Sequence, residues 1–213
     1  MLYKIRQRVY AIQKPVIRMS SRWLSALLPY QPMKGGRDLL NAEYARGEWD
    51  YLRNLTELSR FSVVAGYCHY FHPEGKILEI GCGEGILQER LCSSNYKRFV
   101  GVDISDEAIR RASQQQDEKT VFVREDAALY IPDDQFDIIV FNESLEYFSD
   151  PLGTVKRYAD FLDPRGILIV SMYVGIDTVR TKRIWRQLEA VYSPRAETTV
   201  STQPGYTWII KVY

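Results

Sequence analysis

The chain of 213 residues is long enough for one α/β domain with a modest extension, and its 46% hydrophobic and 26% charged residues indicate a folded globular protein rather than a disordered one. No uninterrupted apolar run approaches the ~20 residues that a membrane-spanning helix requires, so we expect no transmembrane segment. The three cysteines, Cys68, Cys82 and Cys92, lack a CxxC spacing and only two histidines accompany them, so the sequence predicts no disulfide framework and no metal site and fits a reducing cytoplasm.

A basic segment begins the chain. Residues 1–37 contain eight lysines and arginines and no acidic residue, so the remainder of the chain is net acidic. Between positions 2 and 12, apolar residues recur at intervals of three and four, which indicates a helix with one apolar face. We expect a basic amphipathic extension over residues 1–37 that either packs over the ligand cleft or makes peripheral contact with a membrane surface through residues 1–28. Nucleic-acid contact and a removable transit peptide are the remaining interpretations.

Residues 38–72 are expected to form a helical lead-in to the main domain. Two aromatic residues near its start, Tyr44 and Trp49, are candidates for a lid that closes over a bound ligand. The segment ends at a turn that Pro73 and Gly75 predict. The apolar positions spaced for its buried face are Leu52, Leu55, Leu58 and Val63.

Residues 77–85 hold the strongest local signal in the chain. Their sequence is Ile-Leu-Glu-Ile-Gly-Cys-Gly-Glu-Gly, in which an apolar run stops at three glycines on alternate positions and a helical pattern follows. This order predicts a strand, a tight loop and a helix. Glycine permits positive φ values and a close approach of ligand to main chain, and the first N–H groups of the following helix point toward the loop. We therefore expect a ligand-binding loop here.

Strands and helices alternate beyond this loop. Buried strands are expected at residues 98–103, 120–124, 136–141 and 167–170, and helices at 84–94, from 105, from 151 to about 163, and at 180–191. Strand-like segments at 198–201 and 206–213 flank Gln203-Pro204-Gly205, which predicts an antiparallel hairpin. The predicted fold is a doubly wound α/β domain over residues 73–213, with a mainly parallel seven-stranded sheet, a C-terminal antiparallel hairpin and N-terminal helices.

Three features separate the candidate nucleotide cofactors. The loop reads Gly81-x-Gly83-x-Gly85 rather than G-x-G-x-x-G, so its third glycine is not where a pyrophosphate site requires it. Glu79 precedes the loop, and a carboxylate there would repel a pyrophosphate but suits a cofactor that carries an ammonium group. The terminal antiparallel hairpin is the third feature.

On these residues, the domain resembles a class I S-adenosylmethionine-dependent methyltransferase over roughly residues 73–213. Residues 77–85 are similar to the family's first motif, and the resemblance implies that Glu79 lies near the methionine end of the cofactor. It also implies that Asp103 accepts hydrogen bonds from the ribose hydroxyls and that Ile104 packs on adenine. Asp126 matches the position at which the family recognises the adenine edge. The implied cofactor-binding set is Glu79, Gly81, Cys82, Gly83, Gly85, Asp103, Ile104, Asp126, Ala127 and Asn142.

The segment from Asn142 to Tyr147 falls where the family places its substrate-facing motif. It lacks the Asn-Pro-Pro-aromatic signature of methyltransferases that act on nucleobase amino groups. Ser144 to Tyr147 is similar to a Val-Leu-Glu-His stretch of small-molecule members, but Tyr147 replaces the histidine, so no histidine base is available there. Glu143 is therefore the first candidate for a catalytic base or acceptor-orienting group, and Glu146 is the second. Both also fit the description of helix-initiating carboxylates.

Three tyrosines, Tyr130, Tyr147 and Tyr173, each follow the end of an expected strand. They either line a pocket for the methyl acceptor, where aromatic faces also attract a sulfonium, or pack at the edge of the sheet. The sequence leaves both interpretations open.

These observations predict a methyltransferase that uses S-adenosylmethionine and transfers its methyl group to an oxygen or nitrogen of a small-molecule acceptor such as a sugar, lipid or secondary metabolite. An RNA or protein methyltransferase anchored by the basic amino terminus is the alternative, although nucleic acid is the less expected partner. A nicotinamide-dependent oxidoreductase or a non-catalytic cofactor-binding protein is a third interpretation. We expect a cytoplasmic protein, membrane-peripheral if residues 1–28 bind lipid. The sequence does not predict the oligomeric state.

Overall fold

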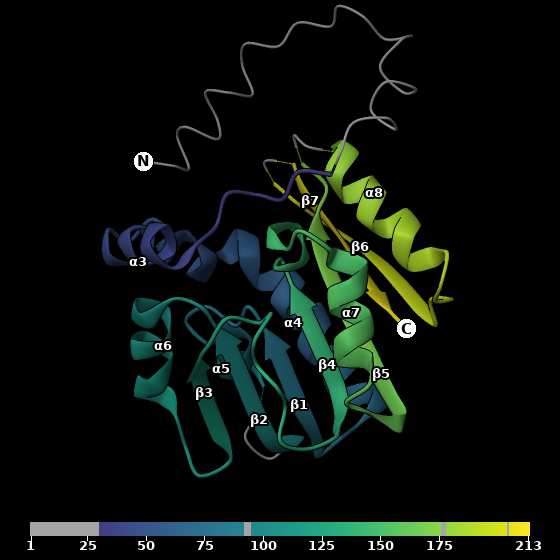
Figure 1. Cartoon of the computed structure of the whole chain (residues 1–213), viewed down its shortest axis with the longest axis horizontal. Coiled ribbons are helices and arrows are strands. Elements are labelled where there is room, and N and C mark those ends of the chain that lie inside the picture. The colour runs from purple at the N-terminus through teal and green to yellow at the C-terminus, as the bar shows by residue number, and fades with distance from the viewer. Residues whose placement is uncertain (1–29, 92–94, 176–177, 204) are drawn as a thin grey trace, which may run out of the picture.

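The computed structural model describes residues 30–91, 95–175, 178–203 and 205–213, and it places a central sheet between helices (Figure 1). Most of the expected basic extension, including the segment 1–28 considered for membrane contact, lies outside the described residues. Within the part of the chain that is described, no helix combines the length and the apolar character needed to cross a membrane.

The sheet contains seven strands, whose order is β3-β2-β1-β4-β5-β7-β6. Neighbours from β3 to β5 pair in parallel, whereas β7 runs antiparallel to both β5 and β6. The predicted doubly wound sheet with its antiparallel C-terminal hairpin is therefore confirmed. The strands are β1 (Gly75–Ile80), β2 (Tyr96–Asp103), β3 (Thr120–Arg124), β4 (Phe136–Asn142), β5 (Leu162–Tyr173), β6 (Ala196–Thr202) and β7 (Tyr206–Val212).

The strand order fixes where a ligand can bind. The chain runs outward from β1 through β2 to β3 and then returns to β4 on the other side of β1. Open α/β sheets bind ligands in the crevice at the carboxyl ends of the strands, where the order reverses in this way. The carboxyl ends of β1 and β4 therefore define the position of the site.

Two apolar cores cover the two faces of the sheet. Alternate strand residues point to opposite faces, so Ile77 and Ile138 pack on the side of α4, whereas Leu78 and Ile139 pack on the side of α7 and α8. The helices are α3 (Arg37–Ala45), α4 (Leu55–Phe71), α5 (Ile86–Arg90), α6 (Asp106–Ala112), α7 (Pro151–Ala159) and α8 (Thr178–Glu189), with 3-10 turns η1 (Asp50–Arg53), η3 (Ser113–Gln115) and η4 (Leu145–Tyr147).

The buried face predicted for residues 38–72 is wrong in one respect. Leu55 is 81% exposed, and α4 instead buries Phe61 and Val64 against the sheet. The reason is a break before the helix, because η1 ends at Arg53 and Asn54 adopts an extended conformation. Leu52 and Leu55 therefore belong to different helical segments, and their three-residue spacing does not place them on the same helix face.

Predicted helix starts agree better with the structure than predicted helix ends do. Asp150 caps α7 by accepting a hydrogen bond from the Gly153 N–H at 3.0 Å, with proline at the first turn, and Ser105 caps α6 through the Ala108 N–H at 3.2 Å. However, α7 ends at Ala159 rather than near residue 163, because β5 already begins at Leu162.

Candidate active site

A cavity of about 640 Å³ opens at the carboxyl ends of β1, β2, β4 and β5. Its wall contains nearly every site residue that the sequence predicts, together with the start of α4. Gly85 and Tyr130 are the two predicted site residues that do not line it. The predicted residues on the wall are Tyr44, Trp49, Glu79, Gly81, Cys82, Gly83, Asp103, Ile104, Asp126, Ala127, Asn142, Glu143, Glu146, Tyr147 and Tyr173.

The glycine loop is held against the end of β2. Gly81 and Cys82 donate backbone hydrogen bonds to the Val102 carbonyl at 2.8 and 3.0 Å. Gly81 has a φ of 77°, and a side chain there would begin 2.5 Å from the Ser144 Cβ atom. Gly83 has a φ of 53°, and a side chain there would begin 2.7 Å from the Tyr44 hydroxyl. Positive φ values and the close packing of Ser144 and Tyr44 thus both require glycine at these two positions of the loop.

Asp103 presents a carboxylate on the cavity wall at the end of β2. Its two oxygens accept hydrogen bonds from the Gly83 and Ser105 N–H groups, each at 2.9 Å. Burial raises the pKa of Asp103, and these N–H groups oppose that change. The two N–H groups fix the orientation of the carboxylate. Each oxygen retains a further lone pair, so the carboxylate can also accept hydrogen bonds from two hydroxyl groups.

Asp126 and Ala127 follow β3 and also line the cavity. The Asp126 carboxylate accepts a hydrogen bond from the Ala128 N–H at 2.8 Å, so part of its capacity is used within its own turn. The Ala127 carbonyl accepts from Arg157 and Tyr158 of α7 at 2.6 and 2.8 Å. These contacts fix the loop after β3 at the edge of the cavity.

Glu79 is a buried carboxyl with an open bonding position. It is 2% exposed, and its Oε2 atom has no hydrogen-bond partner among the described residues. Burial raises its pKa to about 8, although a hydrogen bond from Asn142 and the charge of Arg60 act in the opposite direction. A buried oxygen without a hydrogen bond costs free energy, so a ligand that donates a hydrogen bond to Oε2 would be stabilised here. An ammonium group is such a donor.

Arg60 is a site residue that the sequence did not reveal. It is almost fully buried, and it donates to Glu57 Oε2 at 2.7 Å and to Asn142 Oδ1 at 2.6 Å. Its guanidinium also lies 4.0 Å from the centre of the Phe61 ring. A buried cation on the wall can pair with an anionic ligand group. The three-residue spacing from Glu57 was visible in the sequence, but it indicates only a helical ion pair.

Glu143 is the better placed of the two candidate catalytic carboxyls. Its backbone is strained, with a φ of 63°, and its side chain accepts hydrogen bonds from Ser171 Oγ at 3.1 Å and the Tyr173 N–H at 3.0 Å. Burial raises its pKa to about 8, and nearby Glu146 and Glu57 add to the effect while Arg60 opposes it. A carboxyl with a pKa near neutrality can accept a proton from a reacting group.

Glu146 has a structural contact instead. It is buried in η4, and its Oε1 atom accepts a hydrogen bond from Thr181 Oγ1 at 3.0 Å. Its main-chain carbonyl accepts from the Met33 N–H at 2.7 Å. These contacts join η4 to α8 and to the segment before α3.

Aromatic side chains form one end of the cavity. The Tyr173 ring lies 5.6 Å from that of Trp208 and 6.0 Å from that of Tyr206, and all three residues line the cavity. Sequence reasoning did not select Tyr206 or Trp208, although their alternate positions in a strand place them on one face. Tyr147 lines the cavity near Gly35. Tyr130 instead packs at the edge of the core beside α7.

A lid, defined here as residues 37–53, covers the glycine loop. Its Tyr44 ring is buried and stacks on Trp49 at 5.6 Å between ring centres, and both residues line the cavity. Trp49 Nε1 donates to Glu43 Oε2 at 3.2 Å. Tyr44 and Trp49, which the sequence predicts as lid residues, thus line the cavity, and their closure over a ligand stays a prediction. Among the residues that the structure describes, no group of three or more potential ligands could hold a metal ion.

The chain is similar in sequence to known methyltransferases. A family model described as a methyltransferase domain matches residues 22–200. The 27-O-demethylrifamycin SV methyltransferase of Amycolatopsis mediterranei is 30% identical over 132 residues, which are 55% of this chain and 48% of that protein. The malonyl-(acyl-carrier protein) O-methyltransferase of Priestia megaterium is 32% identical over 107 residues, which are 49% of this chain and 39% of that protein. The chain therefore spans about half or less of these curated relatives.

A solved structure has the same fold over most of the chain. The N-methyltransferase NodS from Bradyrhizobium japonicum, in complex with S-adenosyl-L-homocysteine, is similar with a TM-score of 0.69. The likeness covers 82% of this chain and 95% of NodS at 21% sequence identity. At that identity the comparison establishes a shared fold.

Proposed function

Because the chain belongs to the class I S-adenosylmethionine-dependent methyltransferase family, we propose that it binds S-adenosylmethionine in this cavity and transfers the methyl group to an oxygen or nitrogen of a small molecule. The single observation that carries the proposal is the joint placement of Glu79, Asp103 and Glu143 on one cavity wall. The first two suit the cofactor, and the third suits an acceptor that must lose a proton.

The polar groups of the cavity fit the cofactor in chemistry and number. The unpartnered Glu79 Oε2 atom can accept from the ammonium group, and the buried Arg60 guanidinium is the nearby charge of the right sign for the carboxylate. Asp103 can accept from the two ribose hydroxyls. Gly81 and Gly83 line the cavity without side chains, so their main chain can approach the methionine portion closely.

The cofactor supplies an electrophilic methyl group on a sulfonium, and the protein must supply position, a water-poor site and a route for the proton. Much of the rate of such a displacement comes from holding the acceptor atom in line with the methyl group. The aromatic end of the cavity, at Tyr173, Tyr206 and Trp208, can hold the apolar body of the acceptor. Glu143 lies beside it, bonded to the Tyr173 N–H, and can take the proton from a hydroxyl or ammonium.

Names of the relatives support an acceptor oxygen or nitrogen without choosing between them. The two curated relatives are named as methyltransferases of a demethylrifamycin and of malonyl-(acyl-carrier protein), and NodS is named as an N-methyltransferase. The choice of a small-molecule acceptor, such as a sugar, lipid or secondary metabolite, is our proposal for this chain.

Calorimetry and label transfer together test the proposal. S-adenosylmethionine should bind the full chain with micromolar affinity, and NADH should not. Methyl-labelled S-adenosylmethionine, incubated with separate small-molecule, RNA and protein fractions, should label the small-molecule fraction, and Glu143→Gln should reduce that labelling. Label confined to RNA or protein would overturn the small-molecule acceptor. Tight NADH binding without S-adenosylmethionine binding would overturn methyl transfer altogether.

A further inference from the structure

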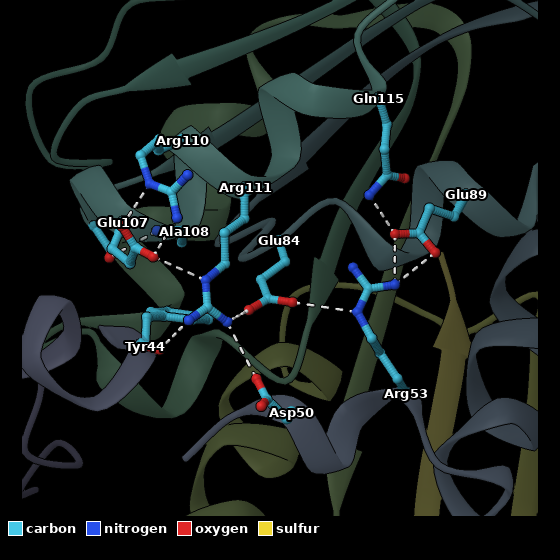
Figure 2. Close-up of polar contacts among 11 residues, drawn as sticks. Tyr44, Asp50, Arg53, Glu84, Glu89, Glu107, Ala108, Arg110, Arg111 and Gln115 are labelled. Atoms are coloured by element: carbon cyan, nitrogen blue, oxygen red, sulfur yellow. Dashed lines mark hydrogen bonds and ion pairs between the residues drawn. The ribbon is translucent and has the colours of Figure 1, made fainter. Parts of the chain in front are cut away.

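Glu84, in the glycine loop, holds a buried carboxylate between two guanidinium groups (Figure 2). Arg111 Nη1 donates to Glu84 Oε1 at 2.5 Å, and Arg53 Nε donates to Glu84 Oε2 at 3.4 Å. The side chain of Glu84 is only 4% exposed, so these partners satisfy charge that water cannot reach. The loop under the expected cofactor is therefore held by ionic contacts from both sides.

Arg111 joins three parts of the molecule at once (Figure 2). It lies on α6, where its Nε atom donates to Glu107 Oε1 at 2.9 Å. Its Nη1 atom reaches both Glu84 in the loop and Asp50 in the lid, the latter at 3.1 Å, and its Nη2 atom donates to the main-chain carbonyl of Tyr44. Only a planar group with five fixed donors can serve these acceptors together, so lysine would not replace it.

Arg53 makes a second connection between the lid and the body of the domain. Its Nη1 atom donates to Glu89 Oε2 of α5 at 2.8 Å, and Glu89 also accepts from Gln115 Nε2 at 2.5 Å. Figure 2 shows this chain of contacts running from Arg53 of the lid through Glu89 to Gln115 of η3, the turn that follows α6. The lid is thus linked to both α5 and α6.

The lid's other contacts with the domain are mainly polar, among them the hydrogen bonds of Asn41 with Ser105, Asp106 and Glu107 at the start of α6. In α3 only Tyr44 is buried, and η1 buries no residue. The ion pair of Arg37 with Asp106 is half exposed at both partners, where water and salt weaken it. Elements with few buried apolar contacts open at low free-energy cost. Among the described residues, the ion pair of Arg53 with Glu84 joins the lid to the most buried of its acidic partners. Glu84 is also paired with Arg111, which itself donates to Asp50 and to the Tyr44 carbonyl of the lid.

From this geometry we propose that Arg111 and Glu84 form a latch that keeps the lid closed over S-adenosylmethionine. Arg111 does not line the cavity, so it is a positioning residue that acts through Glu84 and Tyr44. Residues of the lid do line the cavity, including Tyr44 and Trp49, so a cofactor bound in the cavity would contact the lid. By reciprocity, the bound cofactor stabilises the closed lid as much as the closed lid stabilises the cofactor.

The test compares Arg111→Gln with Arg110→Gln in the full chain. Both positions lie in the last turn of α6, but Arg110 is 60% exposed and contacts only Glu107 among the described residues. Arg111→Gln should raise the Kd for S-adenosylmethionine by about 10-fold or more, with faster cofactor dissociation. It should also speed amide hydrogen exchange in residues 37–53 without cofactor. Arg110→Gln should leave binding and exchange as in the wild type.

Two further variants, Glu84→Gln and Asp50→Asn, test the latch independently. Glu84→Gln preserves shape but removes the charge, and should reproduce the effect of Arg111→Gln on lid exchange. Should Arg111→Gln fail to fold, Asp50→Asn removes only the exposed lid end of the latch and should still raise the Kd and speed lid exchange. Wild-type affinity and lid exchange in Arg111→Gln, or in Asp50→Asn where that variant replaces it, would overturn the latch. Because the latch rests on cofactor binding, a wild-type protein that does not bind S-adenosylmethionine would overturn the proposed function as well, and the two failures are distinguishable.

Discussion

Because Glu79 has a raised pKa, we predict that the binding of S-adenosylmethionine releases a proton into the solvent. The carboxyl is buried, its pKa is raised to about 8, and its Oε2 atom lacks a partner in the described structure. An ammonium group placed beside it favours the ionised form, so binding should return its pKa toward the ordinary value of about 4.3. The proton that Glu79 holds in the free protein must then leave.

The size of the release follows from the two groups that pair. At pH 7 a carboxyl with a pKa of about 8 is about 0.9 protonated, so its ionisation releases about 0.9 proton. The amino group of the cofactor, with an ordinary pKa of about 8, takes up about 0.1 proton when it is held as ammonium. The net release is therefore about 0.8 proton at pH 7, close to 1 at pH 6, and about zero at pH 8, where uptake and release cancel.

Titration calorimetry measures this number directly. The apparent binding enthalpy, compared between two buffers of unlike ionisation enthalpy at pH 6, 7 and 8, gives the protons exchanged per cofactor. Glu79→Gln keeps the size of the side chain and should abolish the release while weakening binding. Glu143→Gln is the matched control, because its carboxyl also has a pKa of about 8 but lies at the acceptor end. Binding enthalpies independent of buffer at pH 6 and 7, or an unchanged release in Glu79→Gln, would refute the reasoning.

Three other predictions concern the same cavity. Asp103→Asn should weaken S-adenosylmethionine binding by about 10-fold or more in calorimetry, because the amide cannot accept at both oxygen positions. With an identified acceptor, kcat/KM from S-adenosylhomocysteine formation should rise from pH 6 to about 8 as Glu143 loses its proton, and Glu143→Gln should abolish the rise and lower kcat about 100-fold. Gly83→Ala should cost about 1 kcal/mol or more of unfolding free energy and weaken cofactor binding, since its φ is positive and its side chain would meet Tyr44. Gly66→Ala, a control with open space in α4, should retain wild-type binding and gain about 0.5 to 1 kcal/mol in thermal or denaturant unfolding.

Elements buried on both faces were predictable because their signals are local. The strand expected at 120–124 has the same bounds in the structure, and the hairpin at the carboxyl terminus is present as expected. The proximity of Gly83 and Asp103 could also be predicted, since Gly83 follows β1 and Asp103 is the last residue of β2, the neighbouring parallel strand. For residues at strand ends such as these, the order of the strands in the sheet alone determines which residues lie close together.

Other parts of the site depend on contacts that no local pattern encodes. Arg60 donates to Asn142, 82 positions away in the sequence, and a charged residue on an amphipathic helix is ordinarily expected at the surface. Tyr130 illustrates the opposite error, because it follows a strand end as predicted but its loop turns toward α7 rather than the cavity. The path of each loop is set by tertiary packing, so the strand end alone does not determine which way a side chain points.

The buried acids of the cavity have a common physical explanation. Glu79 and Glu143 each have a pKa raised to about 8, chiefly by burial, so both are largely protonated at neutral pH before any ligand binds. In the neutral form they avoid most of the desolvation cost that two buried carboxylates would carry. A cationic ligand group reverses that balance, because it makes the ionised carboxylate the favoured form beside it. We therefore expect the same burial that makes these acids costly as ions to favour a ligand that places positive charge beside them.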